Sequence, residues 1–111
     1  MEIPKDTEEK IGQLQMMEQS LQSFLSQKQQ FSMQLVEIES ALSELENTNK
    51  SYKIIGNIMV EAEKTELKTD LTSKKEMIEL RIKTIERQEN QIREKTSKLQ
   101  SEIMSKIKKE D

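Results

Sequence analysis

Apolar residues recur at alternating intervals of three and four along residues 14–45, and nearly every position between them is Gln, Glu, Ser or Lys. A 3.5-residue repeat sustained over this length is typical of a coiled-coil seam, and a disordered chain would not keep it. The pattern predicts a helix over about residues 5–47, with Pro4 suited to its first turn. The ten seam positions are Leu14, Met17, Leu21, Phe24, Lys28, Phe31, Leu35, Ile38, Leu42 and Leu45.

A second seam follows and predicts a helix over about residues 65–109, with Thr65 as a plausible N-cap. Its spacing again alternates between four and three, apart from one extra four-residue step between Ile78 and Ile82. Such a step predicts a local relaxation of the supercoil. The seam positions are Leu67, Leu71, Lys74, Ile78, Ile82, Ile85, Glu89, Ile92, Thr96, Leu99 and Ile103.

The two seams match each other if the chain folds back on itself. The residue numbers of facing positions then add to 112 at Leu45 with Leu67 and to 113 at the paired layers beyond. We therefore expect an antiparallel pair of helices, each of roughly 43 residues and about 65 Å long. Lys28 would lie one layer from Glu89, which predicts an ion pair across the seam. The alternative is that both side chains extend outward into water.

Residues 51–62 form the one β-type stretch and predict a short β-hairpin. We place its turn at Gly56-Asn57, a pair that tolerates positive φ angles, although it could fall after Val60, near residues 62–64. An isolated hairpin is marginal in water and has open edges, so this apolar segment is expected to join hairpins of other chains in a shared sheet or barrel. The alternative is that it only caps the coiled coil. The predicted oligomerisation residues are Tyr52, Ile54, Ile55, Gly56, Ile58, Met59 and Val60.

The two ends of the chain are expected to meet at the tip of the coiled coil, far from the hairpin. Met16 and Ile11 lie off the strict seam there, so helix pairing alone does not hide them. Adaptable Met and Ile side chains could form a soft apolar contact surface, although each could equally be an ordinary seam residue at a helix end. The predicted tip residues are Ile3, Ile11, Leu14, Met16, Met17, Leu99, Ile103, Met104 and Ile107.

Composition supports one elongated domain over residues 1–111 and excludes several function classes. Aromatic residues make up only 3% of the chain and charged residues 35%. The chain therefore has too few bulky apolar side chains to fill a globular core. The net charge is −3 and acidic residues interleave with the basic ones, so nucleic-acid binding is not expected. Without Cys, His or a phosphate-binding motif, we expect no enzyme, no metal and no cofactor. Without a membrane-length apolar segment, a cytoplasmic location is the default.

Three stretches resemble archaeal prefoldin beta subunits. They are residues 26–30, residues 52–60 with an aromatic-Lys-x-x-Gly-Asn core, and residues 79–89 with the run Arg-x-Lys-Thr-Ile-Glu-Arg-Gln-Glu. The similarity extends over essentially the whole chain, although the tail at residues 108–111 is shorter than in many relatives.

The resemblance implies a hexamer of two alpha and four beta subunits, in which the hairpins join in a double β-barrel. It also implies that the coiled-coil tips bind unfolded polypeptide clients and deliver them to a group II chaperonin without ATP. Residues 52–60 would then be the assembly element, and the tip residues would bind clients. The alternative function is a structural coiled-coil spacer or tether, which would leave the apolar hairpin unexplained.

Overall fold

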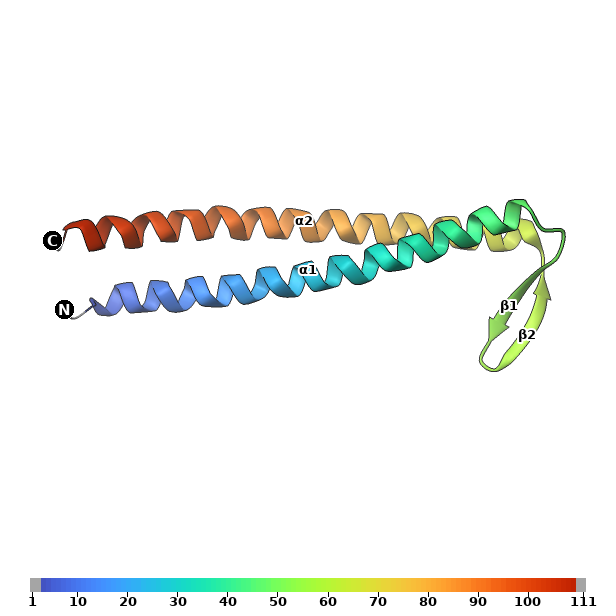
Figure 1. Ribbon diagram of the computed structural model, residues 1–111, viewed down its shortest axis with the longest axis horizontal. Coiled ribbons are helices and arrows are strands. Elements are labelled where there is room, and N and C mark those ends of the chain that lie inside the picture. Colours follow the sequence, from blue (N-terminus) through green and yellow to red (C-terminus); the bar gives the residue numbers. More distant parts are fainter. Residues whose placement is uncertain (1–2, 110–111) are drawn as a thin grey trace. The chain divides into compact units, whose positions relative to one another are not determined.

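The computed structural model describes residues 3–109. Two long antiparallel helices are joined by a β-hairpin, in the order α1 (Lys5–Glu46), β1 (Ser51–Ile55), β2 (Ile58–Ala62) and α2 (Lys64–Lys109) (Figure 1). The predicted fold class is therefore confirmed. The chain divides into two compact units, each containing a segment of both helices. The terminal unit comprises the chain up to Lys28 and from Thr84 onward, and the hairpin unit comprises residues 29–83.

α1 begins at Lys5, as predicted, and α2 begins at Lys64, one residue before its predicted start. The carbonyl of Pro4 accepts the first α1 hydrogen bond, from Glu8 N at 3.0 Å, so Pro4 lies just before the first turn. In α2 the carbonyl of Glu63 accepts from Leu67 N at 3.1 Å, so the N-cap is Glu63 and the prediction of Thr65 was wrong. The reason is that β2 continues to Ala62, which leaves a single residue between strand and helix.

In the terminal unit, the predicted antiparallel register is confirmed by side-chain contacts between α1 and α2. Asp6 pairs with Lys106, and Lys10 Nζ lies 3.0 Å from Glu102 Oε2; the residue numbers of each pair add to 112. The expected pair between Lys28 and Glu89 is also present, with Nζ 2.7 Å from Oε1. Among the seam residues, Ile85 and Ile103 are buried, and most of the others are half-buried.

In the hairpin unit, the predicted seam position at Lys74 was wrong. Lys75, and not Lys74, turns toward α1, where its Nζ lies 3.6 Å from Glu39 Oε1. Lys74 is exposed and Lys75 half-buried. With Lys75 in the seam, the extra four-residue step lies between Leu71 and Lys75, directly after the four-residue step from Leu67 to Leu71. From Lys75 onward, steps of three and four residues alternate regularly. The predicted position of the extra step, between Ile78 and Ile82, was therefore wrong. Nearby, the Arg81 guanidinium lies 5.8 Å from the centre of the Phe31 ring, again linking the two helices.

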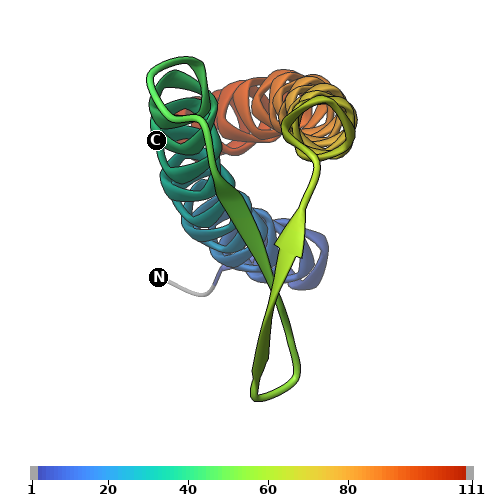
Figure 2. The ribbon, with the colours of Figure 1, turned by 90° about the vertical axis from the view of Figure 1, so that its right-hand side faces the viewer.

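The hairpin turns at Gly56-Asn57, as expected, and the alternative position after Val60 is excluded. Ile55 pairs with Ile58, and the antiparallel register continues to Ser51 with Ala62. Gly56 has a φ of 61°, and no other described residue has a positive φ. Positive φ at the first central residue alone is the pattern of a type II′ turn, which favours glycine there and follows the twist of the strands visible in Figure 2.

Candidate assembly and binding surfaces

The β-hairpin exposes apolar side chains on both of its faces. Because side chains alternate along a strand and cross-strand partners share a face, the register assigns Tyr52, Ile54, Met59 and Glu61 to one face. We call this the pocket face. The opposite, outer face is formed mainly by Lys53, Ile55, Ile58 and Val60. The six apolar side chains among these residues are 44–69% exposed, so within the described chain neither face is covered.

Both long edges of the hairpin also offer backbone hydrogen bonds. In a two-residue hairpin the pair that closes the turn, here Ile55 with Ile58, is a hydrogen-bonded pair, and such pairs alternate along the strands. The intervening residues therefore direct their N–H and C=O groups away from the partner strand. These are Tyr52 and Ile54 on β1 and Met59 and Glu61 on β2. The described sheet has only these two strands, so the outward groups meet no further strand in this chain.

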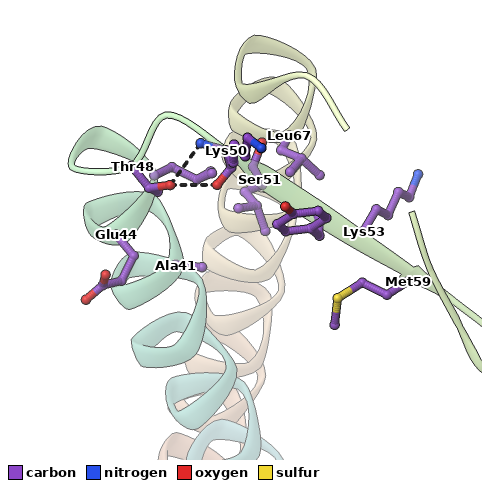
Figure 3. Close-up of a pocket in the computed structure, with 11 residues that line it drawn as sticks. Ala41, Glu44, Thr48, Lys50, Ser51, Lys53, Met59 and Leu67 are labelled. Atoms are coloured by element: carbon purple, nitrogen blue, oxygen red, sulfur yellow. Dashed lines mark hydrogen bonds between the residues drawn. The ribbon is translucent and has the colours of Figure 1, made fainter. Parts of the chain in front are cut away.

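A pocket of about 470 Å³ lies between the root of the hairpin and the adjoining ends of α1 and α2 (Figure 3). Tyr52 and Met59 of the pocket face line one side of it. The helices supply apolar residues such as Leu45 and Leu67, and charged residues also contribute to the lining. The complete lining is Ala41, Glu44, Leu45, Thr48, Lys50, Ser51, Tyr52, Lys53, Met59, Leu67 and Leu71.

Hydrogen bonds connect the chain segments around the pocket. Thr48 Oγ1 donates to the carbonyl of Lys50 at 2.6 Å and accepts from Lys50 N at 3.1 Å, which closes the loop between α1 and β1 (Figure 3). Ser51 Oγ donates to the Ala62 carbonyl at 2.7 Å, which closes the root of the hairpin. The Lys64 ammonium donates to the Glu46 carbonyl at 3.3 Å, a favourable position for a cation at a helix C-terminus.

Sequence reasoning did not identify the helical wall of this pocket. Leu45, Leu67 and Leu71 were assigned only to helix pairing, yet all three also border the pocket. The relevant feature is the pair of consecutive four-residue steps that begins at Leu67, which the structure reveals because Lys75 and not Lys74 enters the seam. Two such steps move the apolar stripe around the helix, so leucines at the hairpin end of α2 turn partly out of the regular seam.

The nine predicted tip residues all belong to the terminal unit, but they differ in exposure. Four face solvent: Ile3 is 52% exposed, Met16 68%, Met104 57% and Ile107 51%. Met104 and Ile107 are three residues apart and so share one face of α2, whereas Ile3 precedes α1 and Met16 lies about three turns into it. The remaining five are half-buried or buried in the helix pair: Ile11, Leu14, Met17, Leu99 and Ile103.

Polar groups surround these apolar residues. The pairs of Asp6 with Lys106 and of Lys10 with Glu102 join the two helices near their outer ends. Thr96 Oγ1 donates to Met17 Sδ at 3.6 Å within the seam. Thr7 is 1% exposed and its hydroxyl has no hydrogen-bond partner among the described residues. The terminal unit thus combines exposed apolar side chains with a seam that is polar in several layers.

No helix among residues 3–109 is long and apolar enough to cross a membrane. In the same part of the chain, no three acidic side chains are grouped closely enough to hold a metal ion. The exposed side chains offer apolar contact at the tip, and apolar contact with strand pairing at the hairpin.

Comparison with known proteins places these surfaces in a family context. A family model described as prefoldin subunit matches residues 8–110. The chain is 36% identical over 107 residues to the prefoldin subunit beta of Archaeoglobus fulgidus, with 94% of this chain and 92% of the relative covered. It is 37% identical over 108 residues to the prefoldin subunit beta of Methanospirillum hungatei, with 95% and 90% covered.

A solved structure gives the same result for the fold. The crystal structure of the prefoldin beta subunit from Thermococcus strain KS-1 superposes with a TM-score of 0.87 at 34% sequence identity. The alignment covers 94% of each chain, so it includes both helices and the hairpin.

Proposed function

Because the chain belongs to the prefoldin subunit family, whose members are non-enzymatic chaperones, we propose that it captures unfolded polypeptides at its coiled-coil tip and passes them to a group II chaperonin without ATP. Its similarity to archaeal beta subunits covers nearly the full length of the chain. The capture step is inferred from four apolar side chains of the terminal unit that are each more than half exposed: Ile3, Met16, Met104 and Ile107.

These side chains suit a binder of many different clients. Met is unbranched and polarizable, so it adapts to apolar partners of varied shape. The ion pairs of Asp6 with Lys106 and Lys10 with Glu102 lie beside them and keep the helices joined while leaving the apolar groups in water. Ile11, Leu14, Met17, Leu99 and Ile103 complete the proposed tip surface, and in the closed helix pair they support it from the seam.

The hairpin is the proposed assembly element, and a prefoldin alpha subunit is the partner that a beta subunit implies. Two alpha and four beta chains would join their hairpins in a shared β-barrel. Each hairpin supplies what a closed barrel needs: free hydrogen-bonding edges on both strands and apolar residues on both faces. The outer face, with Ile55, Ile58 and Val60, would fill the barrel interior, while Tyr52, Ile54 and Met59 would pack toward the pocket and the helix ends.

The capture step is tested with surface substitutions that leave the seam intact. Replacing Met16, Met104 and Ile107 by Gln removes exposed apolar groups only, so the assembly with the alpha subunit should keep its mass and helix content. We expect this variant to lose most of its ability to slow aggregation of a chemically denatured test protein, measured by light scattering. The matched control replaces Met33, Val36 and Met77 by Gln, since these side chains are equally exposed, at 56–66%, but lie in the hairpin unit.

Two results would contradict the proposal. Full protection by the tip variant would reject the tip assignment while leaving the chaperone role intact. An unmodified assembly that never slows aggregation would instead favour a structural spacer. Transfer is tested separately, by adding a group II chaperonin with ATP to the client-loaded assembly and measuring recovery of the folded client; no recovery beyond the spontaneous level would reject the chaperonin step.

A further inference from the structure

A carboxylate is buried in the middle of the helix seam, among mainly apolar layers. Glu89 is a seam residue of α2, and its side chain is only 3% exposed. Its Oε1 lies 2.7 Å from the ammonium of Lys28 on α1, and its Oε2 lies 3.7 Å from Arg93 one turn further along α2. Lys28 is 25% exposed, so the cation still reaches water while the carboxylate does not. An apolar residue at either position would pack more simply, which raises the question of what the charges contribute.

The apolar pattern alone leaves the register of the two helices poorly defined. Seam positions repeat every seven residues from Leu14 to Leu45 in α1 and from Lys75 to Ile103 in α2. Sliding one helix by seven residues therefore places seam residues opposite seam residues again. Such a slip moves the midpoint of the hairpin by about 3.5 residues. One helix therefore lengthens by about one turn beside the hairpin, and the other shortens by the same amount. Most apolar layers would survive it, so hydrophobic burial penalises the slip only weakly.

The charged pair distinguishes these registers because of how side chains lean on a helix. Each side chain tilts toward the N-terminus of its own helix. In an antiparallel pair, Lys28 and Glu89, whose residue numbers add to 117, lie one layer apart and lean toward each other. This explains why they meet although the facing layers near them add to about 113, as at Met17 with Thr96.

A seven-residue slip in either direction breaks the contact and leaves both charges opposite apolar residues. At a facing sum of 120 the two residues remain about one layer apart but lean away from each other, and at a sum of 106 they are eleven positions apart. If facing numbers added to 120, Glu89 would lie opposite Phe31. If they added to 106, Glu89 would lie opposite Met17 and Lys28 opposite Ile78. Pairing in parallel with a second copy fails similarly, because α1 with α1 would place Lys28 against Lys28, and α2 with α2 would place Glu89 against Glu89. A buried carboxylate without its cation disfavours each such arrangement by about a hundredfold or more.

We propose that the Lys28–Glu89 pair is a register and orientation lock: it selects the antiparallel in-register pairing of α1 with α2 against slipped pairings and against like helices of other copies. The pair adds specificity rather than stability, because replacing both charges with apolar residues of similar volume removes the desolvation cost of the ions. This role is independent of client capture and of the proposed assembly.

Cysteine crosslinking tests the lock directly, because the chain has no native cysteine. Leu21→Cys with Ile92→Cys reports the native register, since these residue numbers add to 113. Leu21→Cys with Leu99→Cys reports the slipped register. In the native register these two positions are displaced by about 10 Å along the helix axis, which is too far for a disulfide to close. Each reporter is placed in the otherwise unmodified full chain and in the Lys28→Met/Glu89→Met variant. Refolding mixed isotope-labelled and unlabelled chains, followed by peptide mass analysis, separates crosslinks within a chain from those between copies.

In the unmodified background we expect the native crosslink alone. In the double methionine variant the slipped or between-copy crosslinks should rise at least tenfold, while the midpoint of thermal unfolding stays equal or increases. The matched control is Lys10→Met/Glu102→Met, which removes a 3.0 Å pair whose carboxylate is 54% exposed and should change no crosslink. The charge-reversed variant Lys28→Glu/Glu89→Lys restores the pair and should return the native crosslink.

The proposal is overturned if the folded double methionine variant gives only the native crosslink, or if the Lys10/Glu102 control slips equally. Should the double methionine variant fail to fold, the charge-reversed variant decides: slipped crosslinks in it would reject a lock that depends on pairing, and the native crosslink alone would support it.

Discussion

Replacing Ile55 and Ile58 with lysine should dissociate the proposed assembly into its subunits. The two side chains are 59% and 67% exposed in the single chain, so that fraction of each remains to be buried by a partner. Full burial of an isoleucine contributes about 1.5–3 kcal/mol, so the exposed fractions correspond to about 1–2 kcal/mol each and about 2–4 kcal/mol per hairpin. Burying two ammonium groups adds a further cost in the same direction.

A loss of about 2–4 kcal/mol weakens each hairpin contact by roughly 30- to 1,000-fold, and every beta chain in the assembly carries the change. The measurement is native mass spectrometry together with size-exclusion chromatography of the variant, alone and mixed with a prefoldin alpha subunit. Far-UV circular dichroism should show unchanged helix content, because neither residue contributes to α1 or α2.

The matched control is Met33→Lys/Val36→Lys. These residues are 66% and 63% exposed, so the control removes as much apolar surface and adds as much charge, but on α1. It should assemble normally. The reasoning would be refuted if the hairpin variant kept the mass of the unmodified assembly, or if the helix control dissociated to the same extent.

Three further predictions test the fold itself, each by thermal unfolding. Gly56→Ala should destabilise the chain by about 1 kcal/mol, because alanine is strained at a φ of 61° although the space around the residue is open; no change would mean that the turn relaxes. Ile85→Ala should cost about 2–4 kcal/mol, because Ile85 is 6% exposed, whereas Leu25→Ala at a 50% exposed position should cost well under 1; equal losses would contradict the seam. Thr7→Val should stabilise the chain by about 1 kcal/mol, because it removes a buried hydroxyl without a partner; destabilisation would reveal a missed hydrogen bond.

The sequence was sufficient for the parts of the fold that depend on repetition. The 3.5-residue spacing predicted both helices, and the constant sum of facing residue numbers predicted their antiparallel register, which the contact of Lys10 with Glu102 confirms. The pair of Lys28 with Glu89 followed from the same register. The turn followed from the special backbone freedom of Gly56. In each case a local rule and the long-range pairing required the same arrangement.

The errors occur where two elements compete for the same residues. Thr65 has the chemistry of an N-cap, but the length of β2 fixed the helix start at Lys64. Lys74 and Lys75 are adjacent lysines, so composition could not decide which enters the seam; the reach of Lys75 to Glu39 decided it. The pocket beside the hairpin could not be predicted either, because its walls come from both helices and a strand.

The exposures in the terminal unit also predict that the proposed capture depends on the proposed assembly. Only four of the nine tip side chains are in water, and each leaves about half to two thirds of its surface available. At about 1–2 kcal/mol apiece they give one tip at most a few kcal/mol once ordering costs are subtracted, which corresponds to millimolar binding or weaker. Several tips held around one client raise this by avidity, typically by factors of 10²–10⁴. On the proposed mechanism, a hairpin that no longer assembles should therefore abolish holding even with every tip residue intact, because assembly would supply the affinity that no single tip possesses.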